Sequence, residues 1–147
     1  PPAADLVCGA QTSRAVPPEL LVCNAAGPNH TPVADMGLDE SRGILVITLA
    51  CSFYLCTACL PHLIKAGGGA IVTLGGMMAL SGAKNRVHGS VLKHGLVGMT
   101  RALALHLAPD NIRVHCVSPG PMQTTSAGEG FTHRPAPRHN VPNGPHG

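Results

Sequence analysis

Apolar residues recur along the chain in two patterns, as short continuous runs and as long segments with helical spacing. The short runs are Leu20–Cys23, Ala70–Leu74 and Ile112–Val117, and turn-forming residues follow each of them. Runs of four to six apolar residues bounded by Gly, Pro, Asn or Ser predict buried β-strands. Because the two long segments lie between these runs, the order along the chain predicts βαβ units around a parallel sheet.

The long segment before the third run predicts a helix from about Lys93 to Leu107. Five of its side chains recur at spacings of one, three, three and four, which places them on one stripe of a helix. They are Leu96, Val97, Thr100, Leu103 and Leu107. Pro109 is expected to end the helix, because proline cannot continue the backbone hydrogen bonds.

The other long segment, Ile44–Leu60, contains no charged residue. Its seventeen residues reach the lower limit of a membrane span, which needs about 17–25 residues. The polar residues Thr48, Ser52 and Thr57 interrupt the segment, and Pro61 follows it. We therefore interpret it as a helix buried on most sides, against the sheet and a partner subunit. A small membrane-anchored protein is the alternative.

Length and composition favour one domain with irregular ends. The 147 residues fit one domain at about 100–200 residues per domain. Residues 1–19 and 126–147 are rich in Pro or Gly, so both are expected to be irregular and the tail poorly ordered, around a domain at 20–125. Aromatic residues are scarce and the net charge of +3 is scattered, which argues against a nucleic-acid-binding protein.

No signal-peptide pattern stands at the start of the sequence, so we expect the protein to reside in a reducing cytoplasm. We expect its six cysteines to act there as small core residues. Cys51, Cys56 and Cys59 have the spacing of part of an iron–sulfur motif, with His62 three residues further on. On a helix, however, Cys51 lies about 140° from Cys56. We therefore expect no metal site.

Three segments in the same order resemble the C-terminal half of the short-chain dehydrogenase/reductase family, over about Leu20–Thr125. Leu21–Gly27 looks like the family's Asn-Asn-Ala-Gly turn, and Lys93–Leu105 looks like its helix after the active site. Asn111–Thr124 is similar to the family's last cofactor strand and its Pro-Gly loop. The resemblance implies an α/β fold, a partial Rossmann-like, doubly wound parallel sheet with about three strands and two long helices.

The resemblance also implies hydride transfer between a nicotinamide cofactor, NAD or NADP, and a carbonyl or alcohol substrate. The cofactor-binding positions that it carries over to this sequence are Asn24, Gly27, Lys93, Pro119, Gly120 and Thr124. The family's glycine-rich pyrophosphate turn does not occur before Leu20. The sequence is therefore expected to be a fragment, or a chain that begins in the middle of the domain.

The family's catalytic positions are only partly filled. In the family a Tyr transfers the proton, a Lys four residues later lowers its pKa and binds the ribose, a Ser orients the substrate and an Asn completes a water relay. Lys93 matches the lysine, whereas Gly89 occupies the tyrosine position. The serine position falls on Gly75 and Gly76, and the asparagine position falls on Thr48.

His88 is the candidate substitute for the missing tyrosine, because an imidazole with a pKa near 6.5 suits proton transfer. Neighbouring helical residues point about 100° apart, so His88 does not simply replace residue 89. Ser81 and Ser90 are the candidates for the missing serine, with helix capping as the alternative role.

Two functions remain open at this point. The first is an oxidoreductase of the family's type, acting on a small carbonyl or alcohol. The second is an inactive fragment or pseudoenzyme that acts through packing of its long helices, because the resemblance implies that these helices form dimer interfaces. Both predict a homo-oligomer without nucleic-acid or membrane partners.

Overall fold

A computed structural model describes residues 19–27, 31–82 and 85–120 of the chain. In chain order the elements are β1 (Leu20–Cys23), α2 (Leu38–Leu45), a π-helix (Val46–Ala50), α3 (Cys51–Lys65), β2 (Gly69–Leu74), a 3₁₀ turn (Met77–Ala79), α4 (Val87–Leu107), a second 3₁₀ turn (Ala108–Asp110) and β3 (Ile112–Val117). The strands form a parallel sheet in the order β1-β2-β3. The predicted α/β class with three parallel strands and two long helices is confirmed. The expectations for residues 1–18 and 121–147 lie outside the described residues.

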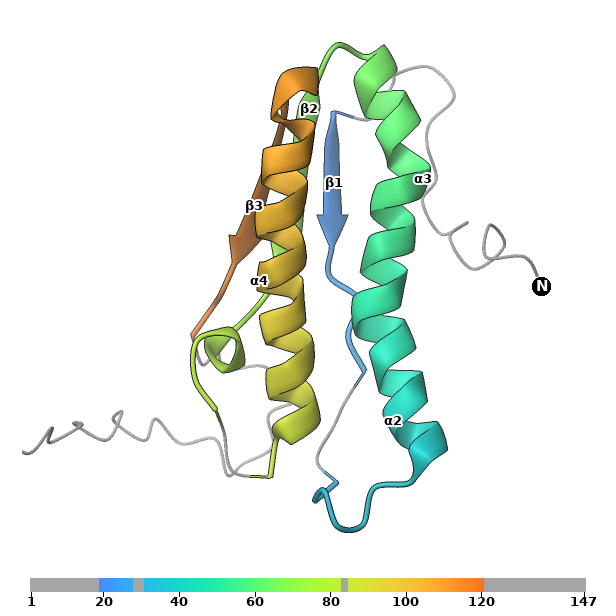
Figure 1. The fold of residues 1–147 in the computed structure, drawn as a ribbon, viewed down its shortest axis with the longest axis vertical. Helices are drawn as coiled ribbons and strands as arrows, with labels where there is room; N and C mark the ends of the chain where they lie inside the picture. The colour runs from blue at the N-terminus through green and yellow to red at the C-terminus, as the bar shows by residue number, and fades with distance from the viewer. Residues whose placement is uncertain (1–18, 28–30, 83–84, 121–147) are drawn as a thin grey trace, which may run out of the picture.

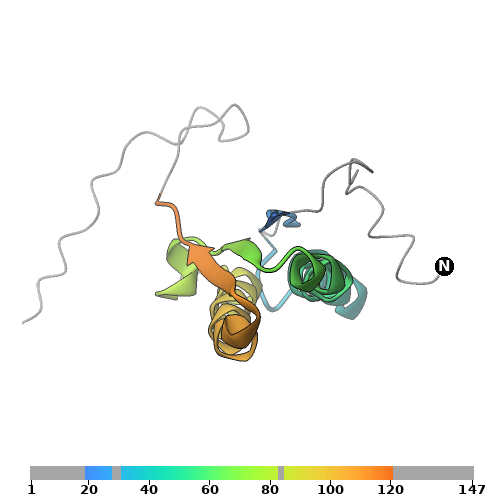
Figure 2. The ribbon, with the colours of Figure 1, turned by 90° about the horizontal axis from the view of Figure 1, so that it is seen from above.

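Both long helices cover the same face of the sheet (Figures 1 and 2). Leu21 and Cys23 of β1 face the helices and are buried, whereas Leu20 and Val22 are exposed on the other face. Each predicted strand thus has buried residues on the helix side. The strands are buried on one face only, because no described element covers the second face.

The core lies between the sheet and the two helices. It is a single cluster of mainly aliphatic and cysteine side chains from all three strands, α3 and α4. Leu96, Thr100 and Leu107 of the predicted α4 stripe are buried, and the other two stripe residues are half-buried. A hydrogen bond of 2.8 Å between the buried hydroxyls of Thr73 and Thr100 ties β2 to α4.

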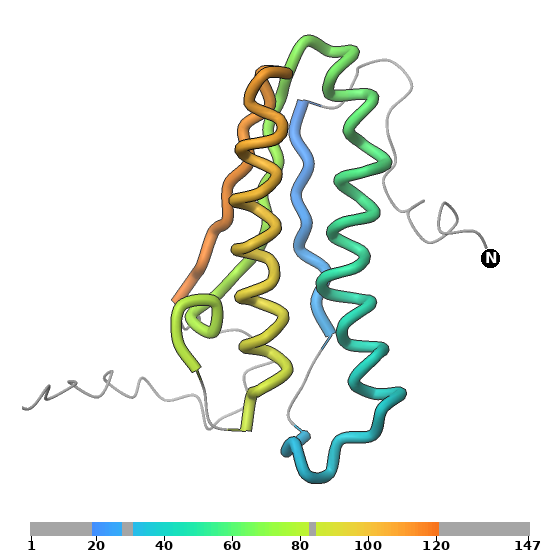
Figure 3. The backbone as a smooth tube through the Cα atoms, viewed as in Figure 1, coloured from blue at the N-terminus to red at the C-terminus, as the bar shows by residue number. Residues whose placement is uncertain are grey.

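The uncharged segment belongs to a longer helix than expected. The continuous trace runs from Leu38 to Lys65 through α2, the π-helix and α3 (Figure 3). Pro61 lies inside α3 rather than ending it, since a proline removes only its own backbone donor. By length and composition this helix could cross a membrane, and its mean hydropathy reaches 2.1. Only 22% of its most apolar window is buried within the chain, so burial on most sides stays a prediction that requires the partner subunit.

Helix α4 begins at Val87, six residues before the predicted start. Gly89 and Ser90 are weak helix formers that hide the apolar period of the first turns. The helix ends at Leu107, and Pro109 lies in the 3₁₀ turn that follows, as expected. The early start matters for function because it places residues 88–93 on one rigid element.

Candidate active site

The candidate site is the edge of the sheet where the strands end. All three strands are parallel, so the turns after Cys23, Leu74 and Val117 emerge at the same edge. In open parallel sheets, ligands bind outside the carboxyl ends of the strands. This edge brings together most of the residues that the sequence singled out.

Lys93 reaches this edge from α4. Its Nζ donates a hydrogen bond of 2.6 Å to the backbone carbonyl of Leu74, the last residue of β2. Burial lowers the pKa of the Lys93 ammonium, and the nearby Cys116 thiol acts in the opposite direction. An ammonium has three donors, so two remain for another partner.

Glycine at position 75 is required by the close approach of two strand ends. A Cβ on Gly75 would lie 2.5 Å from Ser118 Oγ and 3.0 Å from Cys116 Sγ. The Gly75 amide donates a hydrogen bond of 2.8 Å to the Val117 carbonyl. Gly76 has a φ of 127°, a conformation that favours glycine, and a Cβ there would meet nothing within 4 Å. Neither residue offers a group for proton transfer.

Gly89 faces Met78. A Cβ at position 89 would lie 3.1 Å from Met78 Sδ and 3.2 Å from Met78 Cε. The methionine side chain therefore lies against the position at which the resemblance implies a tyrosine. Nothing in the sequence pattern indicates this contact, because Met78 lies in the short 3₁₀ turn after β2, whose direction the apolar period does not fix.

The turn after β1 is held by the π-helix. The Gly27 amide donates a hydrogen bond of 3.4 Å to Thr48 Oγ1, and Ser52 Oγ donates one of 2.7 Å to the Thr48 carbonyl. Asn24 is exposed and Gly27 is half-buried. Thr48 thus contacts the candidate cofactor turn, a role that its match to the asparagine position did not reveal.

His88 and Ser90 lie in the first turn of α4. His88 Nδ1 and Ser90 Oγ are buried and have no hydrogen-bond partner among the described residues. On a helix His88 is about 140° from Lys93, whereas Ser90 is about 60° from it, so only the serine shares the lysine's side. Ser81 is exposed and donates to the Met77 carbonyl, so neither serine caps α4.

Two further candidates follow β3. Pro119 is half-buried and Gly120 is exposed at the carboxyl edge, where a Cβ on Gly120 would meet nothing within 4 Å. Thr124 lies outside the described residues. In the described ranges no group of three or more potential ligands could hold a metal ion, and Cys56 and Cys59 face the core.

A model of the family described as enoyl-(acyl carrier protein) reductase matches residues 10–143. The chain belongs to the short-chain dehydrogenase/reductase family. It is 36% identical over 116 residues to trans-4-hydroxycyclohexanecarboxylate dehydrogenase of Sinomonas cyclohexanicum, covering 79% of this chain and 44% of that protein.

Solved structures of the family share the fold. A short-chain alcohol dehydrogenase candidate from Sinorhizobium meliloti 1021 gives a TM-score of 0.72 at 34% identity, with 77% of this chain and 44% of that chain covered. A gluconate 5-dehydrogenase candidate from Beutenbergia cavernae, with bound NADP at low occupancy, gives 0.71 at 30% identity, covering 80% and 47%. The chain spans between 41% and 46% of the length of the curated relatives compared.

The described residues at this edge offer one cation and glycine turns to a polar ligand. Lys93 presents an ammonium at the edge, and among the described residues a Cβ on Gly76 or Gly120 would meet nothing within 4 Å. The positions matched to the family's tyrosine and serine are glycines, which cannot transfer a proton. The site is therefore better equipped for binding than for acid–base chemistry.

Proposed function

We propose that this chain carries the nicotinamide-binding edge of an NAD(P)-dependent oxidoreductase, with a small carbonyl or alcohol as substrate. The observation that carries the proposal is the Lys93 ammonium, held at the carboxyl edge by the Leu74 carbonyl. A lysine fixed at this edge, with two donors left, suits the paired hydroxyls of a ribose. The relatives in this family support the proposal through their dehydrogenase activities and the bound NADP.

Several residues of this chain would bind different parts of the cofactor. Lys93 would bind the ribose, and the turns at Asn24–Gly27 and Pro119–Gly120 would border the cofactor. Thr124, beyond the described residues, would contact the nicotinamide amide. When bound, the nicotinamide supplies or accepts the hydride.

His88 is the proposed proton donor to the substrate oxygen. Its Nδ1 is buried and has no hydrogen-bond partner in the described part of the chain, so it could bind a substrate group once the adjoining side chains move. It lies beside Gly89 but on another side of α4 from Lys93. The Lys93 ammonium is therefore not placed to assist proton transfer at His88 as it would at a tyrosine in position 89, so turnover is expected to be slow.

Cofactor binding is tested by fluorescence titration of NADH and NADPH against the full chain. We expect saturable binding that Lys93→Met weakens at least ten-fold. Lys65→Met is the matched control, because Lys65 is exposed at the end of α3, at the opposite edge of the sheet. Equal binding by wild type and Lys93→Met would overturn the role of Lys93, and no binding by the folded chain would overturn the cofactor assignment.

The proton donor is tested with a panel of small ketones and aldehydes, by following the loss of NADH absorbance. His88→Gln is expected to abolish the slow turnover, while His94→Gln, an exposed histidine of the same helix, retains it. Turnover that survives in His88→Gln would show that another group donates the proton.

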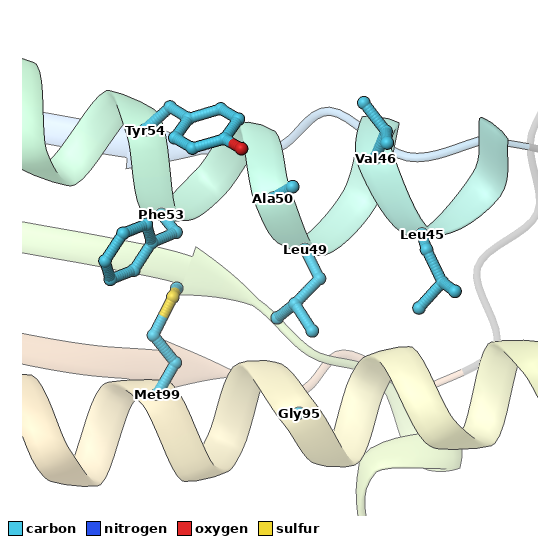
Figure 4. A pocket seen from close by; sticks show the side chains of 8 residues that line it. All are labelled: Leu45, Val46, Leu49, Ala50, Phe53, Tyr54, Gly95 and Met99. Atoms are coloured by element: carbon cyan, nitrogen blue, oxygen red, sulfur yellow. The ribbon is translucent and has the colours of Figure 1, made fainter. Parts of the chain in front are cut away.

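The second candidate function, packing without catalysis, is favoured by an apolar groove of about 520 Å³ between the long helices. Leu49 and Phe53 point from one helix toward Gly95 and Met99 of α4 (Figure 4). The groove residues Val46, Phe53 and Tyr54 are about half exposed. We propose that a second copy of the chain, rather than lipid, covers this groove in a reducing cytoplasm.

Light scattering coupled to size exclusion tests this packing. Phe53→Glu is expected to convert a dimer into a monomer, because a charge in an apolar interface would be buried without a partner. Leu105→Glu, which changes a fully exposed leucine outside the groove, should leave the dimer intact. A Phe53→Glu protein that remains dimeric would exclude this groove as the interface. A dimer that neither binds nucleotide nor turns over a substrate would favour the non-catalytic function.

A further inference from the structure

Ser118 places a hydroxyl over the turn that follows β2. Ser118 is the first residue after β3, and a Cβ on Gly75, the first residue after β2, would lie 2.5 Å from its Oγ. The Ser118 hydroxyl therefore occupies the space into which a side chain at position 75 would project. Gly75 itself has no side chain, so β3 brings a hydroxyl to a turn that has none of its own.

Sheet pairing holds this hydroxyl on the side of the sheet that the helices cover. The Gly75 amide donates a hydrogen bond of 2.8 Å to the Val117 carbonyl, so the pairing of β2 with β3 continues past the end of β2. Cys116 Sγ would lie 3.0 Å from the same Cβ on Gly75, so Cys116 and Ser118 share one face. Alternate residues of a strand face the same way, and Val114 on this face is buried in the core cluster.

Lys93 and Ser118 present two polar groups to the same part of the carboxyl edge. Lys93 Nζ lies 2.6 Å from the Leu74 carbonyl, and Leu74 directly precedes Gly75, over which the Ser118 hydroxyl lies. Ser118 is exposed, and its hydroxyl makes no hydrogen bond to another described residue. A ligand that contacts Lys93 at this edge can therefore also accept a hydrogen bond from Ser118.

We propose that Ser118 is a catalytic residue that donates a hydrogen bond to the carbonyl oxygen of the substrate. This inference rests on the proposed oxidoreductase function. Reduction of a carbonyl places negative charge on its oxygen, and a donor fixed where that charge develops lowers the barrier. Ser118 keeps its own proton, because the product hydroxyl takes its proton from His88. The Gly75 amide cannot act as the donor, since it already binds the Val117 carbonyl.

Ser118 suits this role better than the two serines that the sequence singles out. Ser81 Oγ already donates to the Met77 carbonyl, and Ser90 Oγ is buried in the first turn of α4. A substrate oxygen reaches the exposed Ser118 hydroxyl without any movement of α4. Sequence reasoning missed Ser118, because its place over Gly75 depends on the pairing of two strands.

The first test measures binding of a carbonyl group without turnover. Acetamide and benzamide carry a carbonyl acceptor that NADH does not reduce, and they are titrated against the full chain saturated with NADH while its fluorescence is followed. Ser118→Ala should weaken amide binding about five-fold, the effect of one lost hydrogen bond, and leave NADH binding unchanged. Thr57→Val, which removes an exposed hydroxyl of α3, is the control and should change neither.

The second test moves the hydroxyl from β3 to β2. On the panel of ketones and aldehydes, Ser118→Ala should lower kcat by about ten-fold or more. The double variant Gly75→Ser, Ser118→Gly should recover most of this loss, because it returns a hydroxyl to the same space. The second substitution removes the atom 2.5 Å from the new Cβ, and the Cys116 thiol at 3.0 Å can rotate away.

The outcomes separate the role of Ser118 from the proposed function. Amide binding and turnover in Ser118→Ala that match wild type would overturn the role of this hydroxyl and leave the oxidoreductase function standing. A folded wild-type chain that binds NADH but neither binds an amide nor reduces a ketone would also overturn it. No NADH binding by wild type would overturn the proposed function and this inference together. Ser118 is exposed, so alanine fits there without repacking, and circular dichroism checks that the variants fold.

Discussion

Thr48 has the clearest structural role of any single residue outside the lysine site. It is buried in the π-helix. Its hydroxyl accepts a hydrogen bond from the Gly27 amide, and its carbonyl accepts one from the Ser52 hydroxyl. Thus one side chain connects the turn after β1 to the long helix. The same turn carries two of the candidate cofactor residues, so its order depends on a threonine that is distant in sequence.

Replacing this hydroxyl should free the turn. Thr48→Val keeps the shape of the side chain but leaves the Gly27 amide without its acceptor, which costs about 1 kcal/mol. Amide hydrogen exchange at Gly27 should then become about five-fold faster. Thr48→Ser keeps the hydroxyl and should leave the exchange rate unchanged. Equal exchange in the two variants would show that the bond does not hold the turn.

Lys93 should make stability depend on pH in the alkaline range. Burial lowers its pKa below the ordinary 10.5, so between the folded and unfolded pKa values the unfolded chain binds more protons. The free energy of unfolding of wild type, relative to Lys93→Met, should therefore rise with pH through this window. It should be flat at neutral pH and again above 10.5. Urea unfolding of both proteins from pH 7 to 11 measures the difference, and a fall with pH would contradict the sign.

The sequence identified a site residue only where the resemblance to the family assigned a role to its position. Lys93 was found in this way, and the structure places it at the sheet edge. The contact of Met78 with Gly89 and the hydrogen bond from Gly27 to Thr48 were not predicted. Both join elements whose relative placement depends on packing, which the spacing of residues within one element does not encode.

At the level of elements, the two long helices are in close contact at Gly95. A Cβ there would lie 3.1 Å from Leu49 Cδ2, whereas a Cβ on Gly98 would meet nothing within 4 Å. Both glycines lie inside α4 and carry the same intrinsic helix penalty. They form a natural pair for separating helix propensity from helix packing.

Gly98→Ala should raise the free energy of unfolding by about 0.8–1.0 kcal/mol, which is the helix preference of alanine over glycine. Gly95→Ala should gain less or lose stability, because its methyl group displaces Leu49. Adding Leu49→Ala should reduce the difference between the two glycine variants. Thermal and urea unfolding measure all of these, and equal gains at both positions would show that the helices are not in close contact at Gly95.

The strands were predictable within one residue, whereas the start of α4 and both ends of the helix Leu38–Lys65 were not. Apolar runs and the Gly or Pro residues around them fix a strand locally, and only Gly69 was missed. Pro61 and Gly89 are local signals against a helix, and both were overridden by the packing of α3 and α4 on the sheet. The π-helix could not be predicted, because the spacing of apolar residues across Val46–Ala50 does not differ visibly from that of an α-helix.

At the level of the whole molecule, the described sheet is covered on one face and open on the other. Leu20, Val22 and Val117 expose apolar side chains on the open face, and β1 lies at the sheet edge. Parallel sheets are normally covered on both faces, and exposed apolar edges promote association. This surface is separate from the groove between the helices.

Val22→Lys should therefore reduce concentration-dependent aggregation by placing a charge on the open edge strand. Val33→Lys is the control, since Val33 is equally exposed but lies in the loop before α2. Dynamic light scattering over a concentration series compares the two variants with wild type. The same aggregation in all three would show that the open face does not drive association.

The π-helix at Val46–Ala50 also determines how the chain tolerates changes of length. A π-helix amounts to one extra residue within an α-helix, and each α-helical residue turns the chain by about 100°. Deleting one residue there would rotate α3 relative to α2 by that angle, so Ile44 and Leu63 could not both stay buried. These five residues thus determine which side of α3 faces the core when the apolar side of α2 does. A one-residue insertion or deletion here would change the direction in which the cysteines of α3 point, while barely altering the length of the helix.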